Sequence, residues 1–223
     1  MFEGRLFTKL TTSLGNVRAS ELVCDLVTLF EEGRVLAYDK FTESSIYLRV
    51  GNIDLTVSGG SGSLVRIDLT IDNCDLLENF NNLVNVFNKV LTQKSVVRAE
   101  VKYIELISGF ETYIPLTTAL TIKSTRISNV LSSYGVLIKD LLSEPIDDTQ
   151  LVSVSGSYVV SSLGIVNVVY TAIVRNYSVR SSLSMGKRVS KQEVREELIK
   201  KLVYESYILS QAINEELYTK YSY

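Results

Sequence analysis

The stretch IYLRVGNIDLTV, residues 46–57, decides the fold class. Apolar and polar side chains alternate through IYLRV and again through IDLTV, which is the period of a β-strand with one buried face. Gly51-Asn52, between the two runs, is the kind of dipeptide that forms a two-residue hairpin turn. The implied register places Arg49 opposite Asp54 as an exposed ion pair. The stretch therefore predicts an antiparallel hairpin and an antiparallel sheet around it.

Similar alternation predicts the other strands of this sheet. Apolar residues spaced three and four apart predict helices instead, and Ser108-Gly109 reads as a turn. The expected strands cover 5–11, 35–41, 65–71, 97–103, 116–122, 151–155, 158–161 and 165–177, and the expected helices cover 20–30, 76–91 and 127–142.

A long C-terminal helix is expected after the sequence Ser190-Lys191-Gln192-Glu193, which matches a capping box. Its apolar stripe continues to Tyr218, so a helix of roughly 28 residues would reach about 42 Å. Strands and helices together predict an α+β protein with helices packed on an antiparallel sheet.

The two halves of the chain repeat a similar order of elements. Residues 1–93 read β-α-β-β-β-β-α and residues 94–223 read β-β-α-β-β-β-α, so we expect two similar α+β halves or one continuous domain. This order resembles the β-α-β4-α unit of the TATA-binding-protein-like fold, in which two units form a saddle. The resemblance covers most of the chain and implies a nucleic-acid-binding sheet, but no residue motif of that family occurs here. Two unrelated α+β subdomains, or a single sheet with helices on one face, are the other readings.

The absence of histidine limits the possible chemistry. None of the 223 residues is His, so serine and cysteine nucleophiles with a His base, and His-ligated metals, are excluded within this chain. No Lys-containing phosphate loop occurs, and the Gly/Ser run at 58–63 leads into a strand. Asp72 and Asp75 read as helix-start residues, and Asp147-Asp148 as a turn. We therefore expect neither a catalytic site nor a bound metal or cofactor.

Charge and hydropathy restrict the partners. The net charge is −2, which provides no global field to attract nucleic acid or anionic lipid. No run of 18 apolar residues occurs, so we expect no membrane span and a location in the cytoplasm, or in a virion if the protein is viral. Cys24 and Cys74 are expected to be two buried thiols, with a disulfide as the alternative. The composition resembles that of proteins from thermophilic archaea or their viruses.

One stretch of the chain is basic. Residues 149–192 contain no Asp or Glu, and we expect residues 180–191 to lie in or beside a Ser-rich connection to the last helix. It is either an anion- or partner-binding loop or a solvated loop that offsets the acidic helix. Its candidate contact residues are Arg175, Arg180, Lys187, Arg188 and Lys191.

The C-terminal region is rich in tyrosine, whose ring favours burial while its hydroxyl keeps a polar partner. These residues are core or interface positions, and we expect a docking surface formed by Tyr204, Tyr207, Tyr218, Tyr221 and Tyr223.

The sequence therefore predicts a non-enzymatic binding or assembly subunit that acts through protein–protein contacts in a homo-oligomer or larger assembly. One alternative is a nucleic-acid-binding module that uses a saddle-like sheet or the basic stretch at 175–191. A second alternative is a hydrolase that uses carboxylate-bound metal.

Overall fold

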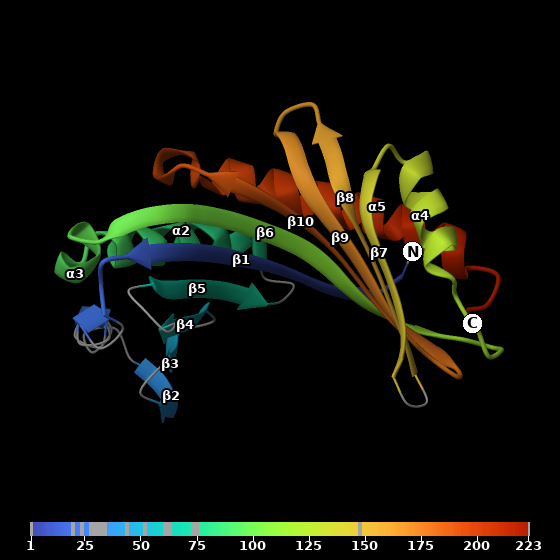
Figure 1. The fold of residues 1–223 in the computed structure, drawn as a ribbon, viewed down its shortest axis with the longest axis horizontal. Coiled ribbons are helices and arrows are strands. Elements are labelled where there is room, and N and C mark those ends of the chain that lie inside the picture. Colours follow the sequence, from blue (N-terminus) through green and yellow to red (C-terminus); the bar gives the residue numbers. More distant parts are fainter. Residues whose placement is uncertain are drawn as a thin grey trace. The chain divides into compact units, whose positions relative to one another are not determined.

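The protein is an α+β protein built on an antiparallel sheet, with a long C-terminal helix (Figure 1). A computed structural model describes residues 2–18, 21–22, 25–26, 35–42, 45–50, 53–59, 64–72, 76–146 and 149–222. Its strands are β1 (Gly4–Gly15), β2 (Val35–Thr42), β3 (Ser45–Val50), β4 (Ile53–Gly59), β5 (Leu64–Asp72), β6 (Glu100–Pro115), β7 (Leu137–Ile146), β8 (Thr149–Val160), β9 (Gly164–Arg175) and β10 (Ser178–Val189). Its helices are α2 (Leu76–Leu91), α3 (Lys94–Val97), α4 (Ser124–Ser133), the short 3₁₀ helix η1 (Lys191–Glu193) and α5 (Glu196–Tyr218).

The described strands form one sheet in the order β2-β3-β4-β5-β1-β6-β10-β9-β8-β7. In the first part of the chain β1 is followed by helical residues at 21–22 and 25–26, then β2 to β5 and α2. In the second part β6 is followed by α4, β7 to β10 and α5. Both parts therefore have the order β-α-β4-α, and in each the first strand pairs with the last.

The hairpin predicted from residues 46–57 is confirmed. Strands β3 and β4 pair antiparallel, with Arg49 opposite Asp54 and Val50 opposite Ile53. Side chains of β4 and β5 alternate between buried aliphatic and partly exposed polar residues, as the sequence pattern predicts.

The predicted turn at Ser108-Gly109 is wrong, because both residues lie inside the single long strand β6. A Cβ on Gly109 would lie 2.5 Å from the Phe7 ring and 2.6 Å from the carbonyl oxygen of Leu183. Glycine at position 109 therefore allows the neighbouring strands to pack closely and does not mark a turn. The strand expected over 116–122 is also absent from the described structure, where Leu116 forms only an isolated bridge with Ser222.

The helix predicted over 127–142 is half wrong. Helix α4 ends at Ser133, and Leu137–Ile146 forms the edge strand β7. Gly135 has φ +86°, a conformation that suits glycine and stops the helix. The leucines of β7 fit a helical spacing and a strand spacing equally well, and the tertiary pairing with β8 decides for the strand.

The expected Ser-rich connection before the last helix is also a strand. Residues 178–189 form β10, which pairs with β9. The two strands expected at 151–155 and 158–161 are one strand, β8. The capping box of Ser190 and Glu193 is present, but it caps η1, so α5 begins later, at Glu196. With 23 residues α5 is about 35 Å long.

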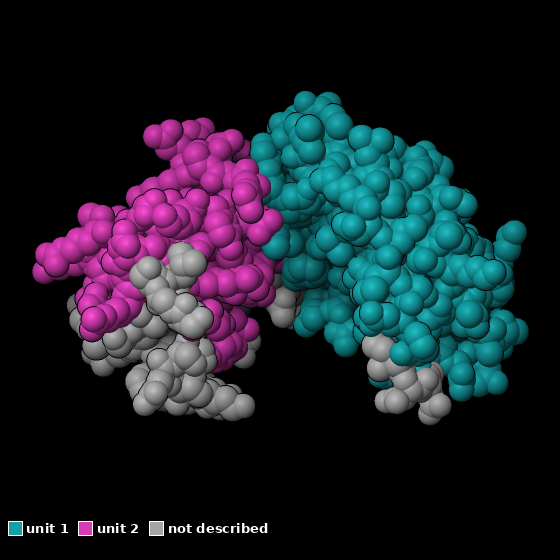
Figure 2. Space-filling view, viewed as in Figure 1, with its two compact units in different colours: residues 1–7, 107–187, 201–223 teal, residues 8–106, 188–200 magenta. Residues whose placement is uncertain are grey.

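Two compact units divide the chain (Figure 2). Unit 1 contains residues 1–7, 107–187 and 201–223, and unit 2 contains residues 8–106 and 188–200. The boundary expected between residues 93 and 94 is not among these unit boundaries. The single continuous domain stays a prediction.

Helix α5 packs on one face of the sheet in unit 1 through a buried polar network. The Tyr170 hydroxyl donates to Asn214 Oδ1 at 2.9 Å and lies 3.0 Å from the Tyr218 hydroxyl. Ser181 Oγ donates to the same Asn214 oxygen at 3.1 Å, and Asn214 Nδ2 donates to Ser210 Oγ at 3.4 Å. All five side chains are buried, and burial raises the pKa of both tyrosines, so both phenols remain neutral. The network fixes the position of α5 over β9 and β10.

Replacing Asn214 with Ala should destabilise the fold strongly. The change removes the acceptor shared by Tyr170 and Ser181 and leaves two buried hydroxyls to find other partners, which costs about 2–4 kcal/mol in the free energy of unfolding. Tyr170→Phe, which removes a donor, should cost less. Asn88→Ala, an exposed Asn in α2, is the matched control for helix propensity. Urea denaturation measures all three, and equal effects of Asn214→Ala and Asn88→Ala would contradict the role of the network.

Candidate interaction face

The face of β7 to β10 that points away from α5 is a candidate site in unit 1, and we call it the open face. On β9, Tyr170, Ala172 and Val174 are buried beneath α5, so Val169, Thr171 and Ile173 point the other way.

Helix α4 lies on the same side of the sheet as α5. The guanidinium of Arg126 in α4 lies 5.8 Å from the ring of Tyr221, which follows α5. The pKa of Tyr134, at the end of α4, is raised mainly by burial and also by the nearby carboxylate of Glu216 in α5.

The pairing register arranges the open face in cross-sheet rows. The first row that crosses all four strands, one step in from the Arg175–Ser178 pair at the β9–β10 turn, contains Arg180, Ile173, Leu151 and Glu144. The next row contains Ser182, Thr171, Ser153 and Leu142, and the one after it Ser184, Val169, Ser155 and Asp140. The centre of the open face is therefore lined by small hydroxyl side chains.

Exposed aliphatic side chains lie on the same face. Val159 and Ile165 are direct cross-strand neighbours and are 63% and 70% exposed. Leu137, one diagonal step away on β7, is also 70% exposed. Leu142 and Val169 extend this group toward the middle of the face. A cluster of exposed aliphatic residues on one face of a sheet is typical of an interaction surface.

A cluster of three charged residues lies beside the open face. Glu111 of β6 accepts from Arg180 at 2.5 Å and from Arg5 at 2.6 Å. Burial alone would raise the pKa of Glu111. The hydrogen bonds and charges of Arg180 and Arg5 outweigh this effect, so the pKa lies below its usual value. Two cations around one carboxylate leave the cluster with one excess positive charge. A surface hollow of about 650 Å³ borders the cluster and is lined also by Glu3 and Tyr113.

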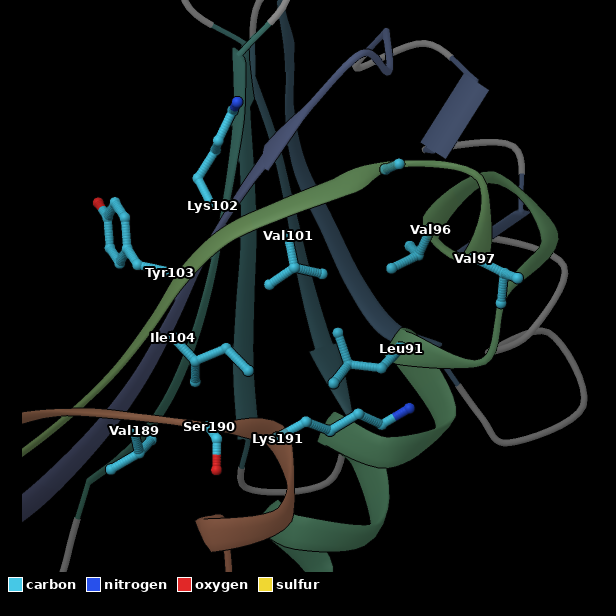
Figure 3. Close-up of a pocket in the computed structure, with 11 residues that line it drawn as sticks. Leu91, Val96, Val97, Val101, Lys102, Tyr103, Ile104, Val189, Ser190 and Lys191 are labelled. Atoms are coloured by element: carbon cyan, nitrogen blue, oxygen red, sulfur yellow. The ribbon is translucent and has the colours of Figure 1, made fainter.

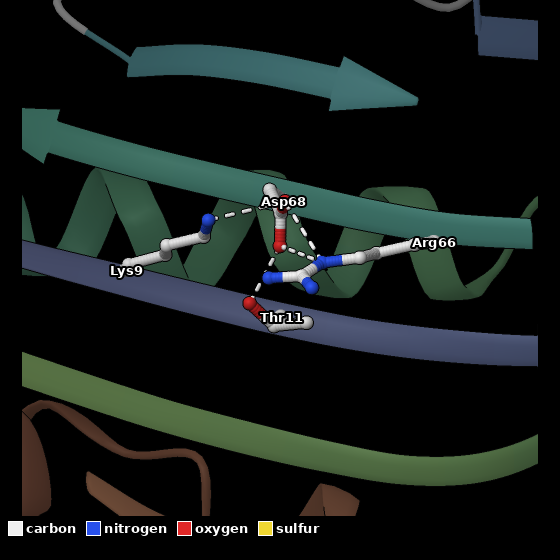
Figure 4. Close-up of polar contacts among 4 residues, drawn as sticks. All are labelled: Lys9, Thr11, Arg66 and Asp68. Carbon is white, nitrogen blue, oxygen red and sulfur yellow. Dashed lines mark hydrogen bonds and ion pairs between the residues drawn. The ribbon is translucent and has the colours of Figure 1, made fainter. Parts of the chain in front are cut away.

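Unit 2 contains a similar cluster (Figure 4). Asp68 of β5 forms ion pairs with Lys9 at 3.1 Å and Arg66 at 3.0 Å and accepts a hydrogen bond from Thr11 at 2.5 Å. Burial opposes ionisation of Asp68, and the three donors outweigh it, so its pKa is lowered. Both clusters hold their carboxylate ionised, which makes them structural ion pairs rather than acid–base groups.

The structure does not bring the five basic candidates together. Arg180 binds Glu111, Lys187 donates to the carbonyl oxygen of Leu163, and the guanidinium of Arg188 lies 5.2 Å from the Tyr103 ring. Arg175 and Lys191 are exposed at the end of β9 and in η1. Because residues 178–189 are a strand, alternation places Lys187 and Arg188 on opposite faces, so the expected loop is wrong, while anion or partner contact by these residues stays a prediction.

The five tyrosines have different environments. Tyr218 is fully buried, so it is a core residue and cannot form the predicted docking surface. The Tyr207 ring packs edge-on against Phe110 at 5.1 Å, and Tyr221 is half-buried beneath Arg126. Tyr204 is 63% exposed and stays a candidate contact, whereas Tyr223 lies outside the described residues.

The remaining expectations concern metal ligands, the two cysteines and membrane-spanning helices. In the described part of the chain, no group of three or more Cys, Asp or Glu lies close enough to hold a metal ion. Cys24, Cys74, Asp75 and Asp147-Asp148 fall outside the described residues. Among the helices that the structure describes, none has the length and apolar character needed to cross a membrane.

Comparison with known proteins adds a weak structural likeness. No family model and no curated protein matches the sequence. Among solved structures the chain is similar to the di-domain ARO/CYC BexL from the BE-7585A biosynthetic pathway, with 8% identity over 95% of this chain and 99% of that chain. The TM-score is 0.24, at which the likeness supports no inference about fold or function.

Replacing Glu111 with Gln should destabilise the protein by roughly 1 kcal/mol at neutral pH, because two arginines lose their shared anion. Since the pKa of Glu111 is lowered by folding, its contribution is complete above about pH 4.5 and disappears as the pH falls through the folded-state pKa. The stability difference between wild type and Glu111→Gln should therefore shrink in acid. Glu100→Gln, which removes the exposed pair with Lys102, is the control and should change stability little at any pH. A pH-independent effect of Glu111→Gln would refute the ion-pair explanation.

Proposed function

We propose that the protein is a non-enzymatic assembly subunit that associates with a second copy of itself through the open face of unit 1. The observation that carries this proposal is the group of exposed aliphatic residues on that face: Leu137, Leu142, Val159, Ile165 and Val169. Contact with a second sheet would remove these side chains from water, which favours association by about 25 cal/mol per Å² of apolar surface. The small Ser and Thr side chains between them allow the close approach of two packed sheets.

The charge pattern supports a second copy as the occupant. Arg180 stands at one end of a cross-sheet row and Glu144 at the other end. A two-fold axis parallel to the strands would place Arg180 of each copy over Glu144 of the other. Such an isologous contact uses one surface patch twice and closes as a dimer. The open face is therefore self-complementary in charge, and it also exposes apolar surface.

Association through the sheet edge is less favoured. The edge strand β7 contains Pro145, which has no N–H to donate, and its pairing with β8 is irregular between Ile138 and Asp140. Proline, bulges and charged residues on an edge strand hinder pairing with another chain. The face therefore supports the proposal better than the edge.

The alternative function is nucleic-acid binding by a sheet of the TATA-binding-protein-like kind. The shared β-α-β4-α order of the two parts, with β1 beside β6, supports this alternative. The balance of charge opposes it, because Arg5, Arg175 and Arg180 on and beside the open face are matched by Glu111, Asp140 and Glu144. Duplex-DNA binding that falls steeply between about 50 and 200 mM salt would favour the alternative. The archaeal or viral origin suggested by composition stays a prediction.

Ile165→Glu should abolish self-association. Wild-type protein is expected to show a molar mass near twice the 24.9 kDa of one chain in light scattering, and the variant a mass near one chain, because the interface would bury an unpaired charge. Ile165 is exposed, so the monomer fold should survive, which circular dichroism checks. Tyr204→Glu on α5 is the matched control and should remain associated. Dissociation by Tyr204→Glu alone, or a monomeric wild type, would overturn the proposal.

A charge exchange tests the two-fold geometry. Arg180→Glu and Glu144→Lys should each weaken association, because each homodimer then contains two like-charge contacts. When the two variants are mixed, both contacts in the heterodimer have opposite charges, so the mixture should associate more tightly than either variant alone. Sedimentation velocity at low salt measures this. A mixture no tighter than its components would contradict the arrangement.

A further inference from the structure

Unit 2 contains a pocket that the proposed self-association does not use (Figure 3). Its volume is about 540 Å³, which lies within the range of small-molecule sites. It is lined by the end of α2, by α3, by the start of β6 and by the junction of β10 with η1. All of the residues that line it belong to unit 2.

The floor of the pocket is aliphatic. Leu91, Val96, Ile104 and Val189 line it and are each at most 9% exposed. Val101, next to them, is 45% exposed, and its side chain points toward Leu91 and Lys191 in Figure 3. An apolar floor that remains open to solvent favours the binding of an aliphatic group.

Lys191 supplies a positive charge at the side of this floor. Its side chain extends toward Leu91 (Figure 3). Among the described residues, no carboxylate forms an ion pair with Lys191 within 4.0 Å. The other lysine of the pocket, Lys102, points to the other side of β6 and pairs with Glu100 at 2.6 Å. Lys191 is therefore the cation placed to receive an anion whose apolar part covers the floor.

We infer that this pocket binds a small amphipathic anion, an aliphatic chain that ends in one carboxylate. The chain lies over Leu91, Val96, Val101 and Ile104, and the carboxylate binds Lys191. Charge-assisted contact with an ammonium group fixes the orientation, while burial of methylene groups provides most of the affinity. The binding requires no covalent step and no other component.

The test uses decanoate as the probe, with decanol and decylammonium as ligands of equal chain length and different head group. Titration into the full chain, followed by calorimetry and by amide chemical shifts around residues 91–104, should show decanoate binding most tightly. Octanoate should bind roughly tenfold more weakly, because two methylene groups fewer are buried. Decylammonium should bind least, because its charge repels Lys191.

Two variants separate the head group from the chain. Lys191→Glu should weaken decanoate at least tenfold and favour decylammonium, while Lys102→Glu, the matched control, should change decanoate affinity less than threefold. Val101→Trp should fill the pocket and weaken decanoate and decanol alike; Val101 is half-exposed, so folding should persist. Equal binding of decanoate and decanol, an unchanged Lys191→Glu, or no binding by the folded protein would each overturn the inference. None of these results depends on the oligomeric state.

Discussion

The alternation of side chains along the strands is the constraint on which the rest of the structure depends. A strand residue can face the helices or face away from them, but not both. In unit 1 the positions of Tyr170 and Ser181 are fixed beneath α5 by hydrogen bonds to Asn214. Every second residue of β9 and β10 is thereby directed to the open face, including Ile173 and Arg180. The buried network and the exposed face are consequences of the same register.

The parts of the fold that could be predicted are those in which the sequence pattern has a single interpretation. The alternation around Gly51-Asn52 fits only a hairpin, and the register of Arg49 and Asp54 followed from it. The leucines of β7 fit two interpretations, because Leu137, Leu141 and Leu142 satisfy a helical spacing as well as a strand. Only pairing with β8, a contact between segments, decides between them. Gly109 is a similar case, since its small size serves packing against Phe7 and Leu183, which local sequence does not reveal.

The candidate site was less predictable than the fold for the same reason. The basic stretch was recognised by composition, but its members act separately once β10 places them on two faces. Apolar residues in a strand are usually buried, so the sequence alone does not mark the aliphatic residues of the open face as exposed. Their exposure follows from the number of helices available in unit 1, which cover one side of the sheet. The signal that could have identified the open face was the alternation of Ser with Val along β8, since Ser side chains are mostly exposed and mark the face that no helix covers.

The central place of β1 and β6 has a consequence for synthesis. Among the strands of this sheet β1 is synthesised first, yet its neighbours β5 and β6 begin at residues 64 and 100. Strand β6 in turn waits for β10, which begins at residue 178. The meander from β2 to β5 can pair as it emerges, whereas the middle of the sheet closes only after β10 has been translated. During this interval the unpaired edges of β1 and β6 can pair with other nascent chains, a hazard that follows from the order of the strands rather than from any one strand.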